Sequence, residues 1–92
     1  MNSLLGTRYL ACGKGYEFLP DSNQGTVYSL KQLQEAVGGY IEVLPVHGQP
    51  NMIAVVNEEG RLRDLPVNPT ASRIVGYEVV GDVAIIPRGG LE

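Results

Sequence analysis

Residues 37–72 decide the fold, and they read VGGYIEVLPVHGQPNMIAVVNEEGRLRDLPVNPTAS. Two runs rich in β-branched residues, YIEVLPV at 40–46 and NMIAVVN at 51–57, flank the glycine- and proline-containing spacer HGQP. This pattern predicts a β-hairpin. Pro45 has no N–H to donate to a ladder, so we expect its N–H side to face a sheet edge or a bulge.

The polar end of the same stretch predicts a second turn. NEEG at 57–60 is read as a turn in which Gly60 takes a left-handed conformation, before RLRDLPV at 61–67 returns along the sheet. GDVAIIP at 81–87 is the last expected strand, because it is apolar and bounded by glycine and proline.

The N-terminal part predicts another hairpin, over residues 3–19. Its strands are expected at 3–11 and 15–19, because the runs LLGTRYLAC and GYEFLP flank the glycines of CGKG. DSNQG at 21–25 has the composition of a loop.

A short helix is predicted at residues 30–37. Ser29 precedes an apolar-periodic run and Gln32 follows three residues later, which is a capping-box pattern with reciprocal side-chain bonds. Gly38 is expected to end the helix in a left-handed conformation. One face carries the apolar residues Leu30, Leu33, Ala36 and Val37.

These elements predict one domain over residues 1–92, of the α+β class. We expect a mainly antiparallel sheet of about four to six strands, with one short helix packed on one face. The apolar face of the helix is expected to meet Ile41, Val43, Ile53, Val55, Val83 and Ile85.

Composition narrows the classes of partner. The chain of 92 residues has one Phe and no Trp, so its core is expected to be small and aliphatic, which favours a homo-oligomer. A net charge of −3 argues against a general DNA or RNA binder. No apolar run is long enough for a membrane span, and the single cysteine allows no intrachain disulfide, as expected for the cytoplasm.

No residue set predicts catalysis, a metal or a cofactor. His47 is the only histidine and has no second ligand at a zinc spacing. Cys12 is interpreted as a small buried thiol, and Glu58 and Glu59 as solvated turn charges. GKG at 13–15 lacks the spacing of a P-loop. We therefore expect a protein that is not an enzyme.

Four pieces of the sequence carry a family resemblance: LQEAVGGYIE at 33–42, NEEGRL at 57–62, LPVNPTA at 65–71 and VGDVAII at 80–86. Together they resemble the DUF3846 family over residues 29–87. Members are short proteins of phages, plasmids and bacteria, so the resemblance implies a small α+β protein of a virus or mobile element in the host cytoplasm. It implies no activity. Many members carry Arg directly after the Asn of LPxN, where this chain has Pro69.

NPTASR at 68–73 suggests an anion site. Asn68 is a good N-cap and Pro69 suits the first helical position, so Thr70 to Ser72 are expected to form a helical turn with free amides. Neighbouring arginines supply positive charge, and an aromatic ring is available for stacking. An ordinary cap or loop has the same composition. The predicted ligand-binding residues are Asn68, Thr70, Ser72, Arg73, Arg61, Arg63 and Tyr40.

The leading functional hypothesis is a non-catalytic accessory protein of a phage or mobile element. It binds and sequesters a small anionic ligand, such as a nucleotide-type immune signal, and so counters host defence. The alternative is a protein–protein interaction module that inhibits or recruits a host protein through a sheet edge or a tyrosine-rich face. The third option is an enzyme acting on the same class of nucleotide.

Overall fold

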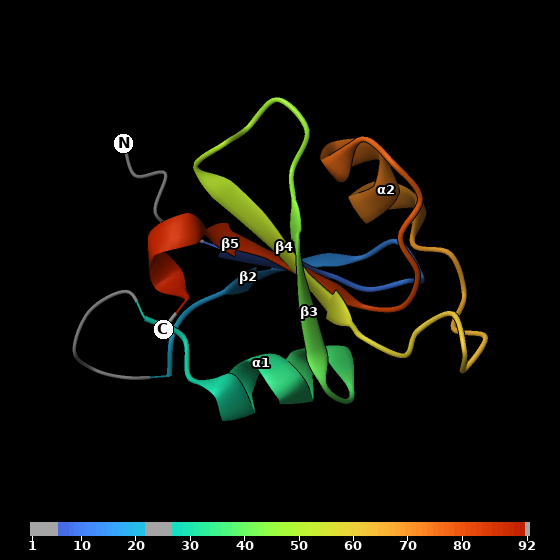
Figure 1. The fold of residues 1–92 in the computed structure, drawn as a ribbon, viewed down its shortest axis with the longest axis horizontal. Helices are drawn as coiled ribbons and strands as arrows, with labels where there is room; N and C mark the ends of the chain where they lie inside the picture. The colour runs from blue at the N-terminus through green and yellow to red at the C-terminus, as the bar shows by residue number, and fades with distance from the viewer. Residues whose placement is uncertain (1–5, 22–26, 92) are drawn as a thin grey trace.

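The computed structural model describes residues 6–21 and 27–91. It is α+β: a five-stranded antiparallel sheet, in the order β2–β1–β5–β4–β3, with two α-helices (Figure 1). The strands are β1 (Gly6–Tyr9), β2 (Gly15–Phe18), β3 (Ile41–Pro45), β4 (Met52–Asn57) and β5 (Val83–Pro87). The helices are α1 (Leu30–Val37) and α2 (Pro69–Val75), and a 3-10 helix follows β5 at Arg88–Gly90.

Two hairpins flank the last strand. β1 pairs with β2 and β3 pairs with β4, as predicted, and β5 lies between the hairpins with β1 on one side and β4 on the other. The inner strands β4 and β5 are buried almost throughout, the inner strand β1 is mostly half-buried, and β2 and β3 are the edge strands. Of the predicted N-terminal elements, residues 3–5 and 22–25 lie outside the described residues.

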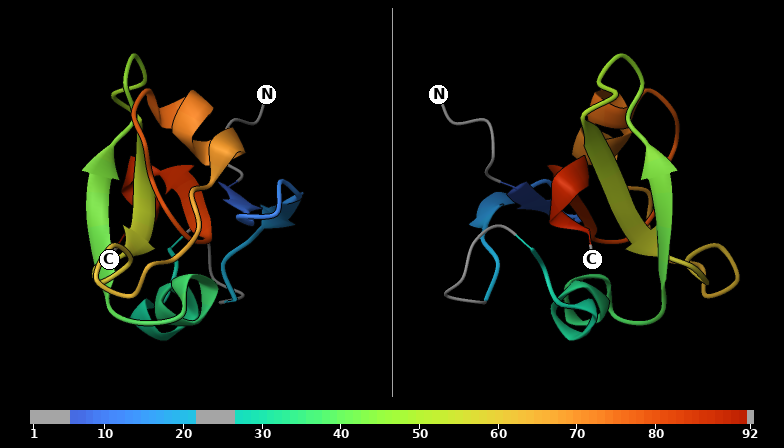
Figure 2. Two further views of the ribbon diagram at one scale, coloured as in Figure 1. Left: turned by 90° about the vertical axis from the view of Figure 1, so that its right-hand side faces the viewer. Right: turned by 60° about the vertical axis from the view of Figure 1, so that its left-hand side comes forward.

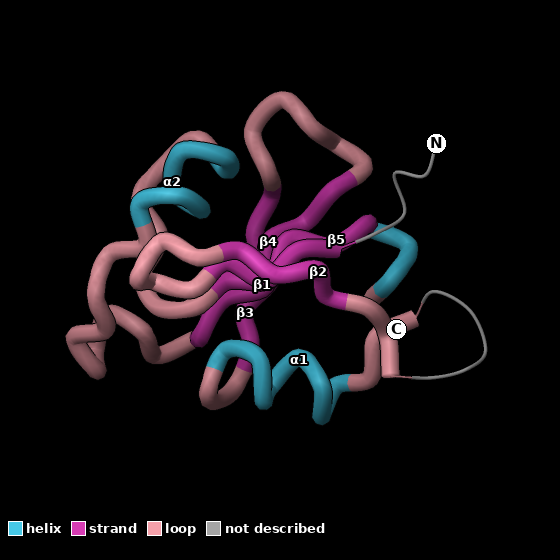
Figure 3. The backbone as a smooth tube through the Cα atoms, turned by 180° about the vertical axis from the view of Figure 1, so that it is seen from behind, coloured by secondary structure: helices cyan, strands magenta, loops and turns pink. Residues whose placement is uncertain are grey.

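One helix covers each face of the sheet. Figure 2 and Figure 3 show α1 and α2 on opposite sides of the strands. On the α1 side the core contains Leu33, Val37, Ile53, Val55, Ala84 and Ile86, together with Tyr28, which stacks on Phe18. On the α2 side it contains Ala54, Val56, Ala71, Val75, Val83 and Ile85. The sequence predicted one helix and, at residues 70–72, a single helical turn. The longer helix α2 closes the other face.

The predicted facing of β5 is wrong by one residue. Val83 and Ile85 were expected under α1, but they pack on the α2 side, while Ala84 and Ile86 meet α1. A strand that is apolar on both faces has no alternation from which its facing can be read. The expected partners Ile53, Val55 and Ile41 do lie on the α1 side.

Helix α1 has the predicted bounds but not every predicted contact. The Ser29 hydroxyl accepts from the Gln32 N–H at 3.1 Å, and Gly38 ends the helix with a φ of 82°. The Gln32 side chain does not bond back to the cap. Instead its amide nitrogen donates to the Leu19 carbonyl at 2.6 Å. Leu30 was expected in the core but is 55% exposed, because it lies at the rim of the sheet beside the open edge of β3.

The NEEG turn is held by a buried asparagine. Asn57 accepts from the Glu59 N–H at 2.8 Å and donates to the Val37 carbonyl at 3.1 Å, which ties the turn to the end of α1. Gly60 is not left-handed, contrary to the prediction. In the loop that follows, the non-glycine residue Asp64 has a positive φ of 53°. Residues 61–66 form turns and a loop rather than a returning strand.

Among the residues that the structure describes, no helix is long and apolar enough to span a membrane.

Candidate functional site

The open side of β3 is the candidate site. β3 ends the sheet, and Pro45 lies on it, as the sequence predicted for an edge or a bulge. The Glu58 N–H donates to the Tyr40 carbonyl at 2.8 Å, which sets the alternation of the ladder between β3 and β4. Even-numbered residues of β3 therefore bond to β4, whereas the N–H and C=O groups of Ile41 and Val43 point away from the sheet.

One end of this free edge is closed. Pro45 has no N–H, and its outward carbonyl accepts a hydrogen bond from the Tyr77 hydroxyl. Burial raises the pKa of Tyr77 above its ordinary value, and the nearby Glu42 carboxylate raises it further. The hydroxyl therefore stays protonated at neutral pH and keeps donating. The stretch left for a partner strand is Ile41 to Leu44.

An apolar pocket lies beside β3 on the α1 side. Its volume is about 380 Å³. Val43 on the strand is 39% exposed and Leu30 on the helix is 55% exposed, so these side chains present open apolar surface. We call it the apolar pocket, and it is lined by Tyr28, Leu30, Leu33, Ile41, Val43 and Leu91.

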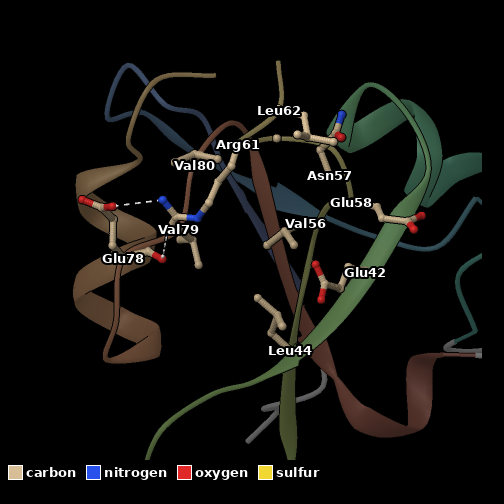
Figure 4. Close-up of a pocket in the computed structure, with 11 residues that line it drawn as sticks. Glu42, Leu44, Val56, Asn57, Glu58, Arg61, Leu62, Glu78, Val79 and Val80 are labelled. Atoms are coloured by element: carbon tan, nitrogen blue, oxygen red, sulfur yellow. Dashed lines mark hydrogen bonds and ion pairs between the residues drawn. The ribbon is translucent and has the colours of Figure 1, made fainter. Parts of the chain in front are cut away.

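A second pocket, of about 160 Å³, lies beside the same strand on the α2 side. Figure 4 shows Val56 and Leu44 at its base, with Glu42 directed toward it from β3 and Arg61 entering from the opposite wall. The Glu58 carboxylate is turned away from the centre (Figure 4). We call it the acidic pocket, and its lining includes Glu42, Leu44, Val56, Glu58, Arg61 and Glu78.

The charges of the acidic pocket are unequal. Arg61 pairs with Glu78 at 3.3 Å and donates to the Glu78 carbonyl at 3.1 Å. Glu42 has no ion-pair partner among the described residues. Three carboxylates and one guanidinium thus line the pocket, and a negative field results.

The predicted ligand residue Asn68 is buried and fully bonded. Its exposed fraction is 0%, and its side-chain oxygen caps α2 by accepting from the Ala71 N–H at 3.0 Å. The side-chain amide donates to the Tyr9 and Gly81 carbonyls, both at 2.9 Å. The capping role that the sequence suggested is confirmed, but all these groups are taken up within the protein.

Ser72 is likewise bonded inside the chain. Its hydroxyl donates to the Val79 carbonyl at 3.2 Å and accepts from the Val79 N–H at 2.9 Å. The Ser72 N–H donates to the Asn68 carbonyl at 3.0 Å, as a helical amide. α2 continues to Val75, beyond the single turn that the sequence predicted.

The remaining predicted ligand residues do not share one pocket. Arg61 lines the acidic pocket, whereas Arg63 donates to the Gly38 carbonyl at 3.3 Å, at the end of α1. Arg73 is exposed in the last turn of α2. The first turn of α2, which was expected to offer free backbone N–H groups, contains the half-buried Thr70 and lies at the other end of the helix. Tyr40 is 67% exposed just before β3. An anion-binding role for these residues stays a prediction.

Sequence reasoning missed Glu42, Leu44 and Leu30 as site residues. The signal was present in Pro45, which marked the edge, and in IEVL at 41–44, which alternates an acidic residue with apolar ones. The pairing of two pockets across this edge depends on α1 and Arg61, which only the tertiary structure brings there.

Cys12 lies exposed in the turn between β1 and β2, so the prediction of a buried thiol is wrong. Within residues 6–21 and 27–91, no group of three or more His, Cys, Asp or Glu side chains is placed to hold a metal ion.

Comparison with known proteins supports the family resemblance. The family model described as "Domain of unknown function (DUF3846)" matches residues 16–90, a longer range than the four pieces suggested. No curated protein and no solved structure matches the chain.

Proposed function

The chain belongs to the DUF3846 family, whose description assigns no function, and we propose from the geometry of β3 that it is a non-catalytic protein-interaction module. It accepts an extended segment of a partner protein, which adds to the sheet as a sixth strand beside β3. The resemblance to short phage and plasmid proteins makes a host protein the expected partner.

A single observation carries this proposal: the outward N–H and C=O groups of Ile41 and Val43 lie between two pockets, one on each face of the sheet. In strand addition, the main-chain bonds supply affinity, and pockets for alternate side chains supply specificity. β3 offers both within Ile41–Leu44. The edge strand β2 also ends the sheet, but none of its residues lines either of these pockets.

Sequestration of a small anion receives less support. The predicted ligand residues Asn68 and Ser72 use their polar groups in hydrogen bonds inside the protein, and Arg61 lies among carboxylates. A nucleotide approaching the acidic pocket meets a negative field. The two functions differ in ligand class, so one set of binding measurements separates them.

The test is selection from a displayed library of short random peptides on the folded protein, followed by hydrogen exchange. In the free protein we expect the outward amides of Ile41 and Val43 to exchange fast. With a selected peptide bound, we expect these two amides to become protected, because the added strand accepts their hydrogen bonds.

A matched pair of proline variants controls the test. Val43→Pro removes an outward N–H without breaking a bond to β4, so it is expected to abolish peptide binding. On the other edge, the Leu10 N–H donates to the Lys14 carbonyl at 2.8 Å, which sets the alternation between β1 and β2. By that alternation, the backbone N–H of Glu17 on β2 points away from the sheet. Glu17→Pro is expected to leave binding intact. Protection elsewhere in the protein, or equal loss in both variants, contradicts the proposal, and retention of nucleotides alone supports sequestration instead.

A further inference from the structure

We infer that the partner segment is a strand that alternates apolar residues with Lys or Arg, the apolar residues facing α1 and the basic ones facing Glu42. This inference rests on the proposed function and adds the chemistry of the partner. It commits to a basic-apolar segment of another protein rather than to a second copy of this chain.

The alternation follows from the pleat of β3. Side chains of an added strand point alternately to the two faces of the sheet. Residues opposite Ile41 and Val43 therefore face the apolar pocket, beside the exposed Leu30. The residue opposite Glu42 faces the acidic pocket. An apolar side chain gains by burial on the first side.

The position opposite Glu42 is the more selective one. Because Ile41 and Val43 are the bonding residues of the free edge, an antiparallel partner places its residue opposite Glu42 in a non-bonded pair. Such pairs have the closer Cα separation, about 4.5 Å, and so the closer side chains. Opposite charges there are favourable and like charges unfavourable. Glu42 has no other ion-pair partner among the described residues, so a lysine or arginine meets a carboxylate that is free to pair.

A second copy of the chain is a poorer fit. IEVLP at 41–45 contains no Lys or Arg. Two β3 strands paired with each other would therefore place no positive side chain opposite Glu42, and the carboxylates of two acidic pockets would approach one another. The charge pattern thus favours a partner of different sequence.

The test uses three synthetic peptides of equal length: one alternates valine with lysine, one alternates valine with glutamate, and one has the lysine composition with its lysines grouped at one end. NMR titration of the labelled full chain measures the affinity and locates the binding. We expect the valine–lysine peptide to bind about fivefold or more tightly than either control, with shifts centred on Ile41 and Val43. Added salt is expected to narrow the difference.

Charge-swap variants make the test specific. Glu42→Gln is expected to reduce the lysine preference, and Glu42→Lys to reverse it in favour of the valine–glutamate peptide. The matched control is Glu17→Lys on the edge strand β2, which keeps the wild-type preference. A preference that Glu42→Lys leaves unchanged overturns the inference even if that variant is fully folded.

The outcomes separate this inference from the proposed function. Equal binding of both alternating peptides at β3 overturns the charge selectivity and leaves strand addition standing. Shifts that avoid Ile41 and Val43 for all three peptides overturn both. A dimer that sediments as such and dissociates on Val43→Pro assigns the edge to a second copy and also overturns the inference.

Discussion

Helices α1 and α2 follow the same local rules, yet their ends do different work. Each has about two turns, a polar N-cap side chain and a left-handed glycine after its last residue. Ser29 caps α1 at a half-buried position and makes one backbone bond there. Asn68 caps α2 in the core and also reaches β1 and the Gly81 carbonyl. The cap of α1 therefore bonds to backbone only at the helix end, whereas the cap of α2 also connects the helix to distant parts of the chain.

The C-caps differ in the same way. Gly38 and Gly76 have similar φ values of 82° and 97°. A Cβ added at Gly38 meets nothing within 4 Å, whereas one added at Gly76 lies 2.7 Å from the His47 Cβ. The space for a side chain is therefore open at Gly38 and occupied by His47 at Gly76, and matched substitutions at these two positions measure the difference.

The largest expected effect is at Asn68. Asn68→Ala removes the cap and leaves the carbonyls of Tyr9 and Gly81 without their donor, so we expect a loss of about 3 kcal/mol in the free energy of unfolding. Urea unfolding measures it. Asn68→Asp keeps the cap acceptor but not the donors, and it too is expected to destabilise strongly. A neutral Asn68→Asp variant would show that the donor bonds contribute nothing.

The next effect separates the two glycines. Gly38→Ala is expected to cost about 1 kcal/mol, because a side chain in the left-handed region is strained. Gly76→Ala adds the contact with His47 and is expected to cost about 2 kcal/mol or more. Thermal unfolding of both variants provides the comparison. Equal costs would mean that the His47 turn moves aside freely.

A smaller effect is expected at the open cap. Ser29→Ala removes one hydrogen bond to the Gln32 N–H and is expected to cost about 1 kcal/mol. Gln32 keeps its side-chain bonds to Leu19 and to the Asp21 N–H, so α1 stays docked. The measurement is again urea unfolding. A loss as large as that of Asn68→Ala would contradict the distinction between the two caps.

The smallest effect appears at alkaline pH. Burial raises the pKa of Tyr28, which precedes α1, and a backbone hydrogen bond from Gly6 partly offsets this rise. Burial also raises the pKa of Tyr77, which follows α2. A raised pKa in the folded state means that folding favours the neutral phenol. Its contribution to the free energy of unfolding is therefore complete below the unfolded-state pKa of about 10 and is lost as the pH rises above that value. We expect Tyr28→Phe to flatten this loss more than Tyr77→Phe, because Tyr28 is 1% exposed and Tyr77 39%. Unfolding measured on both sides of the unfolded pKa compares them.

The sequence predicted local features well because their causes are local. The bounds of α1 follow from Ser29 and Gly38, and the hairpin of β3 and β4 follows from HGQP. The sign of Asn68 as a cap was likewise readable. The tertiary partners of the Asn68 side chain could not be predicted, because Tyr9 is 59 positions away from Asn68 in the chain. A buried asparagine and an exposed ligand residue look the same in sequence.

The open edge was predicted only in part. Pro45 indicated it, but the apolar pocket requires Leu30 to be left at the rim, and the acidic pocket requires Arg61 to fold back to Glu78. The run VAII in β5 is apolar throughout, so its sequence does not indicate which side chains face α1 and which face α2. The exposure of Leu30 depends on where the sheet ends. Such facts follow from the packing of elements rather than from the order of residues.

The position of β5 has a consequence for biosynthesis. Thr7 pairs with Ile85 and Ile53 with Ile86, so β5, which follows the other four described strands in the sequence, joins the two hairpins that precede it. A single hairpin lacks the neighbouring strands that complete the sheet between α1 and α2. Isolated two-stranded hairpins are only marginally stable in water. We therefore expect the nascent chain to stay unfolded until β5 leaves the ribosome and then to fold in one cooperative step, with long-range closure setting the rate.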